Sequence, residues 1–239
     1  MLRSESTSEF ASKQPSLLSI FAALKHANQR RKGSGAEPYI NHLIEVAELV
    51  CGALNQPDVN LVIAALLHDT IEDQGVTKEE LAERFGAEVA DLVAEVTDDK
   101  SLLKEERKRL QIENAPKKSV EAQTIQLADK ISNLRSIATS PPVDWDERRK
   151  VEYVAWAKSV VDCFTAPNPT LKAEFDKTIE RSGWGLPQFN VESESKPPIS
   201  RIIDITDKSL AAGITGYAII GGVPPASWRR KHGYLKNTK

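Results

Sequence analysis

The chain has 239 residues, 40% of them hydrophobic and 28% charged, so it is long enough to bury a core without disulfide or metal cross-links. Its 32 basic and 34 acidic residues give a net charge of -2, which excludes a global field that would steer it to nucleic acid or an anionic membrane. The two cysteines, Cys51 and Cys163, match no metal or redox spacing and are expected to be reduced thiols. With no secretory signal pattern and no long apolar run, we expect a soluble cytoplasmic protein.

Composition divides the chain into three parts. Residues 1–15 are polar, rich in Ser and aperiodic, which predicts a flexible leader. Residues 16–182 carry helical periodicity and no convincing alternating strand, so this part is predicted to be all-α. From 183 to 239, Pro and Gly interrupt short β-branched runs, which predicts a C-terminal extension of mixed or irregular structure and unknown role. Its aromatic content favours packing on the helical body or a second subunit, with Trp184 or Trp228 as the anchor.

Apolar residues recur at helical spacing throughout the all-α part. Helices are predicted at 16–29, 41–54, 61–73, 78–85, 87–96, 104–113 and 124–137, then from a cap at Asp144 or Asp146 to the residues before Pro167, and finally at 171–179. The first helix is expected to bury Leu17, Ile20, Phe21 and Leu24. Thr77 and Glu80 form a capping box for the helix that starts at 78.

The segment LVIAALLHDTIED at 61–73 places ionisable groups directly after an apolar run. Its first seven residues have no polar face, which predicts a helix buried on all sides. A spacing of four residues pairs His68 with Glu72 on one helix face, and Asp69 with Asp73 on the next. A metal ion with an activated water would account for this grouping. The alternative is a solvated helix C-terminus, which the helix dipole disfavours for acids.

The segment TIQLADKISNLRSI at 124–137 also carries an acid where burial is expected. Asp129 lies inside a wide apolar face, and Asn133 follows it one turn later. Asp129 either joins the same site or forms a buried pair with Lys130 or Arg135, and the residues alone leave both interpretations open.

Four ordered motifs resemble a known family: RRKGSGAEPYINH at 30–42, ALLHDTIED at 65–73, EVTDDK at 95–100 and LADKISNLR at 127–135. They are similar to the hydrolase domain of RelA/SpoT-type enzymes, and within these to the small stand-alone alarmone hydrolases that include the metazoan SpoT homologue. These enzymes belong to the HD superfamily of metal-dependent phosphohydrolases. The resemblance covers roughly residues 16–182 and implies an all-α HD bundle.

The resemblance also implies the roles of the motif residues. The ligands of one Mn²⁺ would be His42, His68, Asp69 and Asp129, and the pair that activates the attacking water would be Glu72 and Asp73. The implied reaction is hydrolysis of guanosine tetra- or pentaphosphate, (p)ppGpp, at the 3′ position to GDP or GTP and pyrophosphate. The residues themselves indicate five of these six positions. His42 alone would be taken for a surface or cap residue.

Five further residues are expected to bind the nucleotide. They are Arg31, Lys32, Asn133, Lys104 and Arg149. Basic clusters beside an acidic metal site suit a small polyphosphate better than a polynucleotide. One alternative is the same metal site acting on another nucleotide, such as the 2′-phosphate of NADPH. Another is a catalytically inactive module that only binds nucleotide, and a homo-oligomer is left open.

Overall fold

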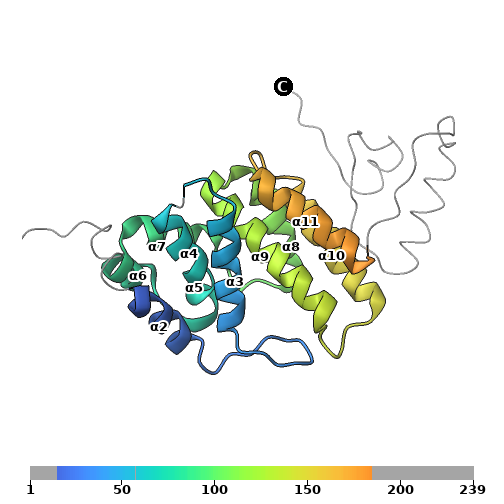
Figure 1. Cartoon of the computed structure of the whole chain (residues 1–239), viewed down its shortest axis with the longest axis horizontal. Helices are drawn as coiled ribbons and strands as arrows, with labels where there is room; N and C mark the ends of the chain where they lie inside the picture. The colour runs from blue at the N-terminus through green and yellow to red at the C-terminus, as the bar shows by residue number, and fades with distance from the viewer. Residues whose placement is uncertain (1–14, 57, 185–239) are drawn as a thin grey trace, which may run out of the picture. The chain divides into compact units, whose positions relative to one another are not determined.

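The structure is a computed structural model that describes residues 15–56 and 58–184 (Figure 1). Its elements are α2 (Pro15–Lys25), α3 (Ile40–Gly52), α4 (Val59–Leu67), α5 (Thr70–Gln74), α6 (Lys78–Phe85), α7 (Ala87–Val96), α8 (Lys104–Asn114), the 3-10 helix η1 (Ala115–Lys117), α9 (Val120–Thr139), α10 (Glu147–Val161) and α11 (Pro169–Ser182). No strand forms among these residues. Two isolated bridges, Arg30 with Pro38 and Gly33 with Pro142, are the β-type pairings there. The all-α prediction for this part is confirmed, whereas the predicted leader and nearly all of the C-terminal extension lie outside the described residues.

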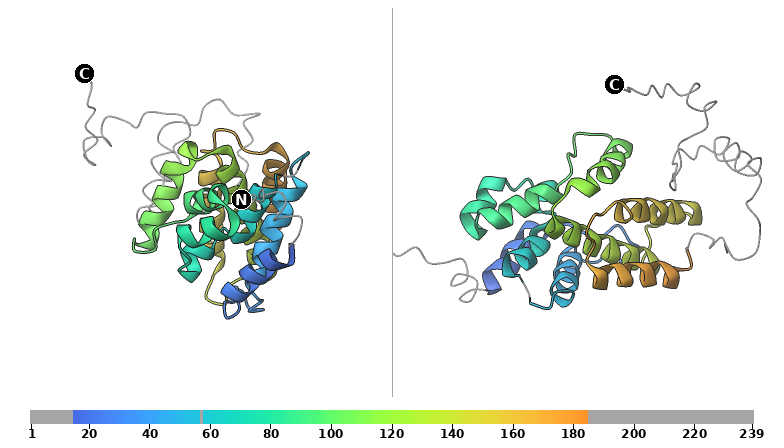
Figure 2. Two further views of the ribbon diagram at one scale, coloured as in Figure 1. Left: turned by 90° about the vertical axis from the view of Figure 1, so that its left-hand side faces the viewer. Right: turned by 90° about the horizontal axis from the view of Figure 1, so that it is seen from above.

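Helix α9 is the centre of the bundle (Figures 1 and 2). It contacts α3, α4 and α7, and also α10 and α11. Leu127, Ile131 and Leu134 have no exposed surface, and the helix is 20 residues long, which lets it cross the core. Ser119 starts it, because its Oγ accepts a hydrogen bond from the backbone N–H of Ala122 at 3.1 Å. Polar side chains on α9 are therefore held inside the molecule by the burial of their apolar neighbours.

The predicted single helix over 61–73 is wrong, because the chain breaks it at His68 and Asp69. Helix α4 ends at Leu67, whose carbonyl accepts a hydrogen bond from Thr70 Oγ1 at 2.6 Å. Asp69 has φ -98° and ψ 0°, outside the helical region, and α5 then starts in a new direction. The two ionisable residues at the junction thus point away from regular helix faces and toward the middle of the bundle.

The predicted inward face of the first helix is right for Phe21 and wrong for Ile20 and Leu24, whereas the side chain of Leu17 lies outside the described part. Leu24 is 71% exposed and Ile20 is 49% exposed, whereas Ala22 is fully buried and Phe21 packs on the core. The helix is rotated by about one residue from the expected stripe, and it ends at Lys25 instead of near Gln29. The reason lies just after it, where buried His26 stacks on a neighbouring aromatic ring and fixes the rotation.

Helix starts follow the predicted capping chemistry closely. Thr77 Oγ1 accepts from the Glu80 backbone N–H at 3.1 Å, and α6 ends before Gly86 as expected. Of the two predicted caps for α10, Asp146 is the one used, since its Oδ1 accepts from the Arg149 N–H at 2.8 Å. Side-chain acceptors at these positions satisfy N–H groups that have no partner within the helix.

Trp184 is the one predicted anchor of the extension that the structure describes. Its indole Nε1 donates to Glu147 Oε2 at 3.0 Å, and Lys150 Nζ lies 5.6 Å from the centre of the ring. The ring also packs against the edge of the hydrophobic core. Trp184 therefore fastens the end of α11 to the start of α10. Trp228 and the rest of the extension lie outside the described residues.

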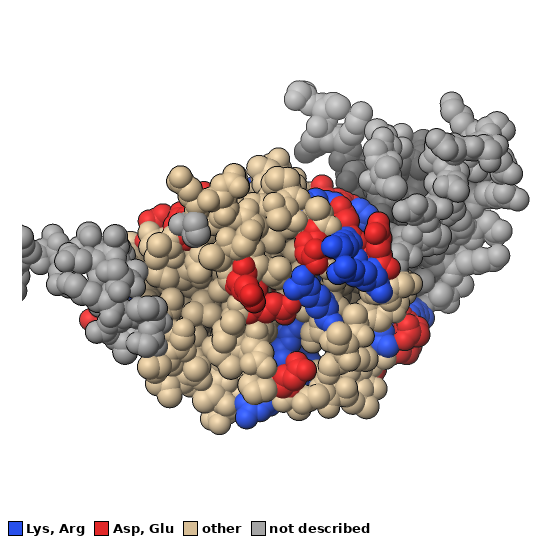
Figure 3. Space-filling model, in the orientation of Figure 1, with Lys and Arg blue, Asp and Glu red and all other residues tan. Residues whose placement is uncertain are grey.

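Charges of both signs are interspersed on the face shown in Figure 3, without a large patch of one sign. Arg135 illustrates this mixing, because it bridges Glu45 on α3 and Glu174 on α11 at 2.9 and 2.8 Å. Within the part of the chain that is described, no helix has both the length and the apolar character needed to cross a bilayer.

Gly33 is a position where the structure leaves no room for a side chain, and it yields a stability prediction. A Cβ at Gly33 would overlap the carbonyl oxygen of Ser140, so Gly33→Ala must push the 30–38 loop off the α9–α10 connection. We expect a loss of about 1–3 kcal/mol in the free energy of unfolding, the usual range for overpacking. Gly52→Ala is the matched control, since no atom lies within 4 Å of its added Cβ, and it should gain about 0.4–1 kcal/mol. Urea unfolding of both variants checks this, and equal stability of the two would contradict the close approach.

Candidate metal centre and active site

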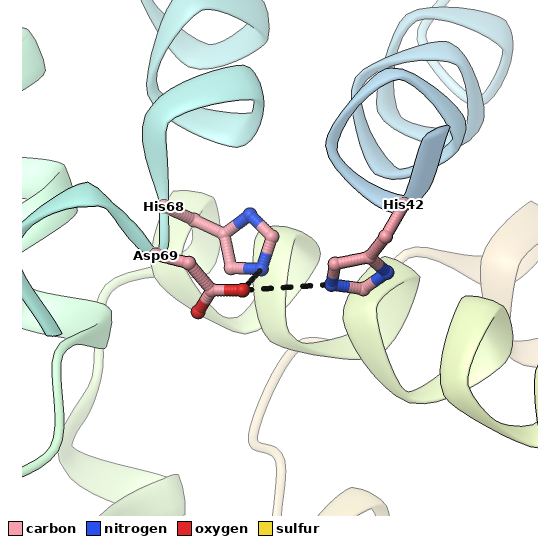
Figure 4. Close-up of side chains that lie close together, drawn as sticks. All are labelled: His42, His68 and Asp69. Carbon is pink, nitrogen blue, oxygen red and sulfur yellow. Dashed lines mark ion pairs between the residues drawn. The ribbon is translucent and has the colours of Figure 1, made fainter. Parts of the chain in front are cut away.

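Four side chains from three separate segments converge in the middle of the bundle. His42 comes from the first turn of α3, His68 and Asp69 from the break between α4 and α5, and Asp129 from the centre of α9. Figure 4 shows the Asp69 carboxylate between the two imidazole rings, with Oδ2 at 3.6 Å from His42 Nε2 and 3.1 Å from His68 Nε2. The ligand atoms of these three residues all lie within 4.8 Å of one another. Asp129 Oδ1 completes the group at 3.3 and 3.8 Å from the same two nitrogens.

The two imidazoles present buried Nε2 atoms that have no hydrogen-bond partner. His68 Nδ1 faces the carbonyl oxygen of Ala65 at 2.8 Å, and because a carbonyl only accepts, Nδ1 carries the proton. His42 Nδ1 is likewise engaged, by Ser132 Oγ at 2.8 Å. Both Nε2 atoms are buried and unpaired, although carboxylate oxygens lie close by. Buried polar atoms without partners are rare in proteins, and two of them aimed at two carboxylates fit a cation.

The carboxylates are oriented by their own partners. Asp69 Oδ2 accepts from the hydroxyl of Tyr39 at 2.6 Å, and Asp129 Oδ1 accepts from Asn133 Nδ2 at 2.7 Å. Lys130 Nζ lies 3.3 Å from Asp129 Oδ2, so the buried pair considered as an alternative does exist. It does not replace the cluster, because the other oxygen of Asp129 still faces the imidazoles. Arg135, the other candidate partner, pairs elsewhere.

Charges within the cluster shift the pKa values in opposite directions. Burial alone would lower the pKa of His68, but the charges of Asp69 and Asp129 outweigh it and raise that pKa well above its usual value. Burial alone would raise the pKa of each aspartate, but the neighbouring cationic groups outweigh it and lower both pKa values well below their usual range. Without a metal the cluster thus retains a proton among its carboxylates and imidazoles. Binding of a cation would release that proton, which makes metal affinity dependent on pH.

Glu72 and Asp73 follow on α5, beside this cluster. A cavity of about 50 Å³ is lined by Glu72 together with His68, Asp69 and Asp129, which is room enough for a water molecule. Burial, reinforced by the charge of Asp69, raises the pKa of Glu72 to about 7, which suits a group that must accept a proton near neutral pH. One oxygen of Glu72 is held by the backbone N–H of Asp98 at 3.2 Å.

Asp73 is held by two side chains from other segments. Gln29 Nε2 donates to its Oδ2 at 2.5 Å, and Lys100 Nζ forms a close ion pair with its Oδ1. Lys100 also lies 3.8 Å from Glu72 Oε1, and Arg107 Nη1 lies 3.6 Å from the same oxygen. Cations therefore bracket the predicted catalytic pair.

Three of the predicted nucleotide-binding residues lie near one another. Lys104, in the first turn of α8, has its pKa lowered by burial and then by the positive charges of Arg149 and Lys32, so the three cations lie near one another. The guanidinium of Arg149 stacks over the ring of Trp145, with Cζ 4.9 Å from the ring centre. No ion pair with an acid involves these three cations within 15–56 and 58–184. Grouped cations of this kind have the chemistry to hold an anion.

Arg31 and Asn133 each lie next to a predicted metal ligand. Arg31 Nη2 donates to the backbone carbonyl of Ser132 at 3.4 Å and, with His42, lines a cavity of about 180 Å³. Asn133 binds Asp129 and also hydrogen-bonds the hydroxyl of Tyr153 on α10. Both residues therefore lie next to a predicted metal ligand.

Sequence reasoning missed the residues that hold the predicted ones in place. Tyr39, Glu45 and Ser132 each contact a predicted ligand or a partner of one, and Lys100 contacts the predicted catalytic pair. A polar residue within a buried helix face could have indicated such a partner, as Ser132 does directly after Ile131 on α9. Glu45 could have been noted because it follows His42 by three residues on the same helix.

Comparison with known proteins agrees with this geometry. The HD domain family model matches residues 19–156, more than half of the chain. The guanosine-3′,5′-bis(diphosphate) 3′-pyrophosphohydrolase MESH1 of Drosophila melanogaster is 45% identical over 163 residues, 68% of this chain and 91% of that protein. MESH1 of Homo sapiens has the same identity over the same shares. A solved structure of a metazoan ortholog of SpoT that hydrolyses ppGpp superposes with a TM-score of 0.68 at 40% identity, covering 77% of this chain and all of that one.

Fold and site together define an HD domain protein, a class that implies a divalent metal held by His and Asp residues. Within that class the chain belongs to the family of the MESH1 proteins. The predicted family and the predicted HD bundle are thereby confirmed.

The raised pKa of Glu72 predicts how the stability of the metal-free protein depends on pH. Because this pKa rises from 4.5 to about 7 on folding, the stabilisation from protonated Glu72 is complete below pH 4.5 and is lost as the pH rises through 7. Relative to Glu72→Gln, the wild-type free energy of unfolding should fall across this window by up to about 3 kcal/mol. Urea unfolding in chelator at a series of pH values measures it. Exposed Glu79→Gln should stay parallel to wild type, and a parallel Glu72→Gln curve would contradict the shift.

Proposed function

We propose that the chain is a Mn²⁺-dependent (p)ppGpp 3′-pyrophosphohydrolase. The observation that carries the proposal is the pair of buried, unpartnered Nε2 atoms of His42 and His68 facing two carboxylates, with Glu72 one short turn away. Relatives that bear this activity in their names match the chain over 91% of their own length at 45% identity, which supports the substrate.

The donor set fits a divalent ion of intermediate hardness. Two neutral imidazoles and two carboxylates suit octahedral Mn²⁺ and leave positions for water and a phosphate oxygen. The residues that would hold it are His42, His68, Asp69 and Asp129. When bound, such a cation supplies Lewis-acid charge that stabilises phosphoryl oxygens and makes water more acidic.

Glu72 is assigned the role of general base. Its carboxylate lines the cavity beside the ligands, and the Asp98 N–H holds it in one orientation. Glu72 takes a proton from water as the water oxygen bonds to the phosphorus attached to the ribose 3′ oxygen. The bond from that phosphorus to O3′ breaks, and O3′ takes up a proton. The products are GDP or GTP and a separate pyrophosphate. Asp73, fixed by Gln29 and Lys100, assists by holding the water and adding negative charge beside Glu72.

The cations Lys32, Lys104 and Arg149 are assigned to the 3′-diphosphate. Grouped cations without acidic partners are costly unless an anion binds, and a diphosphate supplies several oxygens with delocalised charge. Arg31 and Asn133 are assigned to the nucleoside, since both lie against the cluster and Arg31 lines the larger cavity.

A second substrate class uses the same elements. The metal cluster and the three cations would also accept a ribose 2′-phosphate, as in NADPH, because each substrate presents a phosphoester on a ribose. A module that only binds nucleotide is disfavoured, because it would have no need for Glu72 and Asp73 beside a complete donor set.

A direct comparison of substrates tests the function. Purified protein should convert ppGpp to GDP and pyrophosphate with a higher kcat/KM than it shows for phosphate release from NADPH. Chelation should abolish the reaction, and Mn²⁺ should restore it better than Mg²⁺ or Zn²⁺. If NADPH is turned over faster than ppGpp, the second substrate class is the better assignment. If the protein turns over neither compound, the proposed function is wrong.

Two substitutions separate metal binding from proton transfer. Asp129→Ala should lose both the metal and the activity, because it removes a charged donor from a buried site. Glu72→Gln should retain the metal and substrate affinity but lose about 10²–10⁴ in kcat, the usual cost of a missing general base. Elemental analysis and steady-state kinetics on both proteins check this. Full metal occupancy in Asp129→Ala, or a raised KM with normal kcat in Glu72→Gln, would assign these residues differently.

A further inference from the structure

A continuous chain of polar contacts runs from the outer helix α11 to the first predicted metal ligand. Glu174 Oε1 accepts from Arg135 Nη2 at 2.8 Å, and Arg135 Nη1 donates to Glu45 Oε1 at 2.9 Å. The other oxygen of Glu45 accepts from Ser132 Oγ at 2.7 Å. Ser132 Oγ in turn lies 2.8 Å from His42 Nδ1. No step of this chain belongs to the catalytic roles assigned above.

The direction of every hydrogen bond in the chain follows from its chemistry. A guanidinium only donates, so Glu45 Oε1 must accept from Arg135. An ionised carboxylate only accepts, so the single proton of Ser132 Oγ points to Glu45. That leaves Ser132 Oγ as an acceptor toward the imidazole, and His42 Nδ1 must be the donor. The network therefore places the ring proton on Nδ1 and leaves Nε2 with a free lone pair.

This direction matters because His42 can bind a metal through Nε2 only in that tautomer. His68 has the same tautomer because its Nδ1 faces a backbone carbonyl, which can only accept a hydrogen bond. A serine hydroxyl has no such preference, since it can donate or accept. Something must therefore dictate what Ser132 does, and Glu45 is the group in contact with it.

We propose that Ser132 and Glu45 are positioning residues that fix the tautomer and ring orientation of His42. Arg135 sets the direction of the hydrogen bonds between them, because it donates to Glu45. The inference rests on the metal site of the proposed function but not on the identity of the substrate. Ser132 is fully buried, so its hydroxyl has no competing water, and half-buried Glu45 is paired with Arg135 at 2.9 Å.

Replacing Glu45 by glutamine should reverse the chain while preserving its shape. Arg135 still demands an acceptor, so the amide oxygen turns to Arg135 and the amide NH₂ turns to Ser132. Ser132 Oγ then accepts from the amide and donates its proton to His42 Nδ1. The ring proton moves to Nε2, where it points at the other ligands and blocks a cation.

The first experiment observes the tautomer without metal or substrate. Nitrogen-15 NMR of the metal-free full chain should show His42 protonated on Nδ1 in the wild type and on Nε2 in Glu45→Gln. His68 serves as an internal control, because its carbonyl partner is unchanged. Glu48→Gln, an exposed position on the same helix with the same loss of charge, should leave His42 as in the wild type. An unchanged His42 spectrum in Glu45→Gln would overturn the proposal.

The second experiment measures Mn²⁺ affinity by calorimetric titration of the same proteins. Glu45→Gln and Ser132→Ala should each weaken binding by about 10–100-fold, the usual effect of losing a partner of a ligating histidine. The double variant should be no weaker than Glu45→Gln alone by more than about 2-fold, because both act through one proton. If the two substitutions instead weaken Mn²⁺ binding independently, so that their fold-changes multiply in the double variant, Ser132 and Glu45 do not act through one proton and the proposal is overturned.

Ser132→Ala keeps the proposal testable even if Glu45→Gln does not fold. If Glu45→Gln unfolds, Ser132→Ala must still weaken Mn²⁺ binding while its chelator-treated form keeps wild-type helicity. Normal affinity in folded Ser132→Ala overturns the proposal. Failure of ppGpp hydrolysis with normal Mn²⁺ binding would instead count against the proposed substrate and leave this inference standing.

Discussion

The structure depends on one constraint, that two imidazole nitrogens are buried in the centre of a helical bundle without a hydrogen-bond partner. Burying an unpaired polar group costs free energy, and His42 and His68 each leave one such atom beside carboxylates that are also buried. The surrounding helices hold these groups close together. Helix α9 supplies Asp129 from the packed core, and the break after α4 directs His68 and Asp69 inward. The stability of the domain and its chemistry are thus linked through one cluster.

Much of the helical layout could be predicted from the sequence because it is encoded locally. Bounds of α6 and α7 follow from Thr77, Gly86 and the apolar spacing, and the start of α10 follows from Asp146. The first helix shows the limit of such reasoning. Its apolar residues form two overlapping stripes, and only contact with other segments decides that Ala22 is buried while Leu24 is exposed.

The candidate site was predictable where a residue conflicts with its surroundings. His68, Asp69 and Asp129 stand at positions where burial is expected, so their chemistry could be inferred from the conflict itself. His42 lies in a first helical turn, where a histidine raises no such conflict, and only family resemblance indicated it. Partners such as Tyr39 and Ser132 meet their ligands across 30 and 90 residues of sequence, and no local pattern encodes such contacts.

The brevity of α5 has a consequence for how the catalytic pair is assembled. A helix of five residues cannot persist alone, since nucleation costs more than its few hydrogen bonds return. Its start is fixed at Asp69 and its end by the left-handed turn at Gly75, while Asp98 holds the side chain of Glu72, and Gln29 and Lys100 hold that of Asp73. The position of the predicted catalytic pair therefore depends on the segments around residues 29 and 98–100 as much as on the helix itself. A substitution in either segment can misplace the pair without touching any predicted metal ligand.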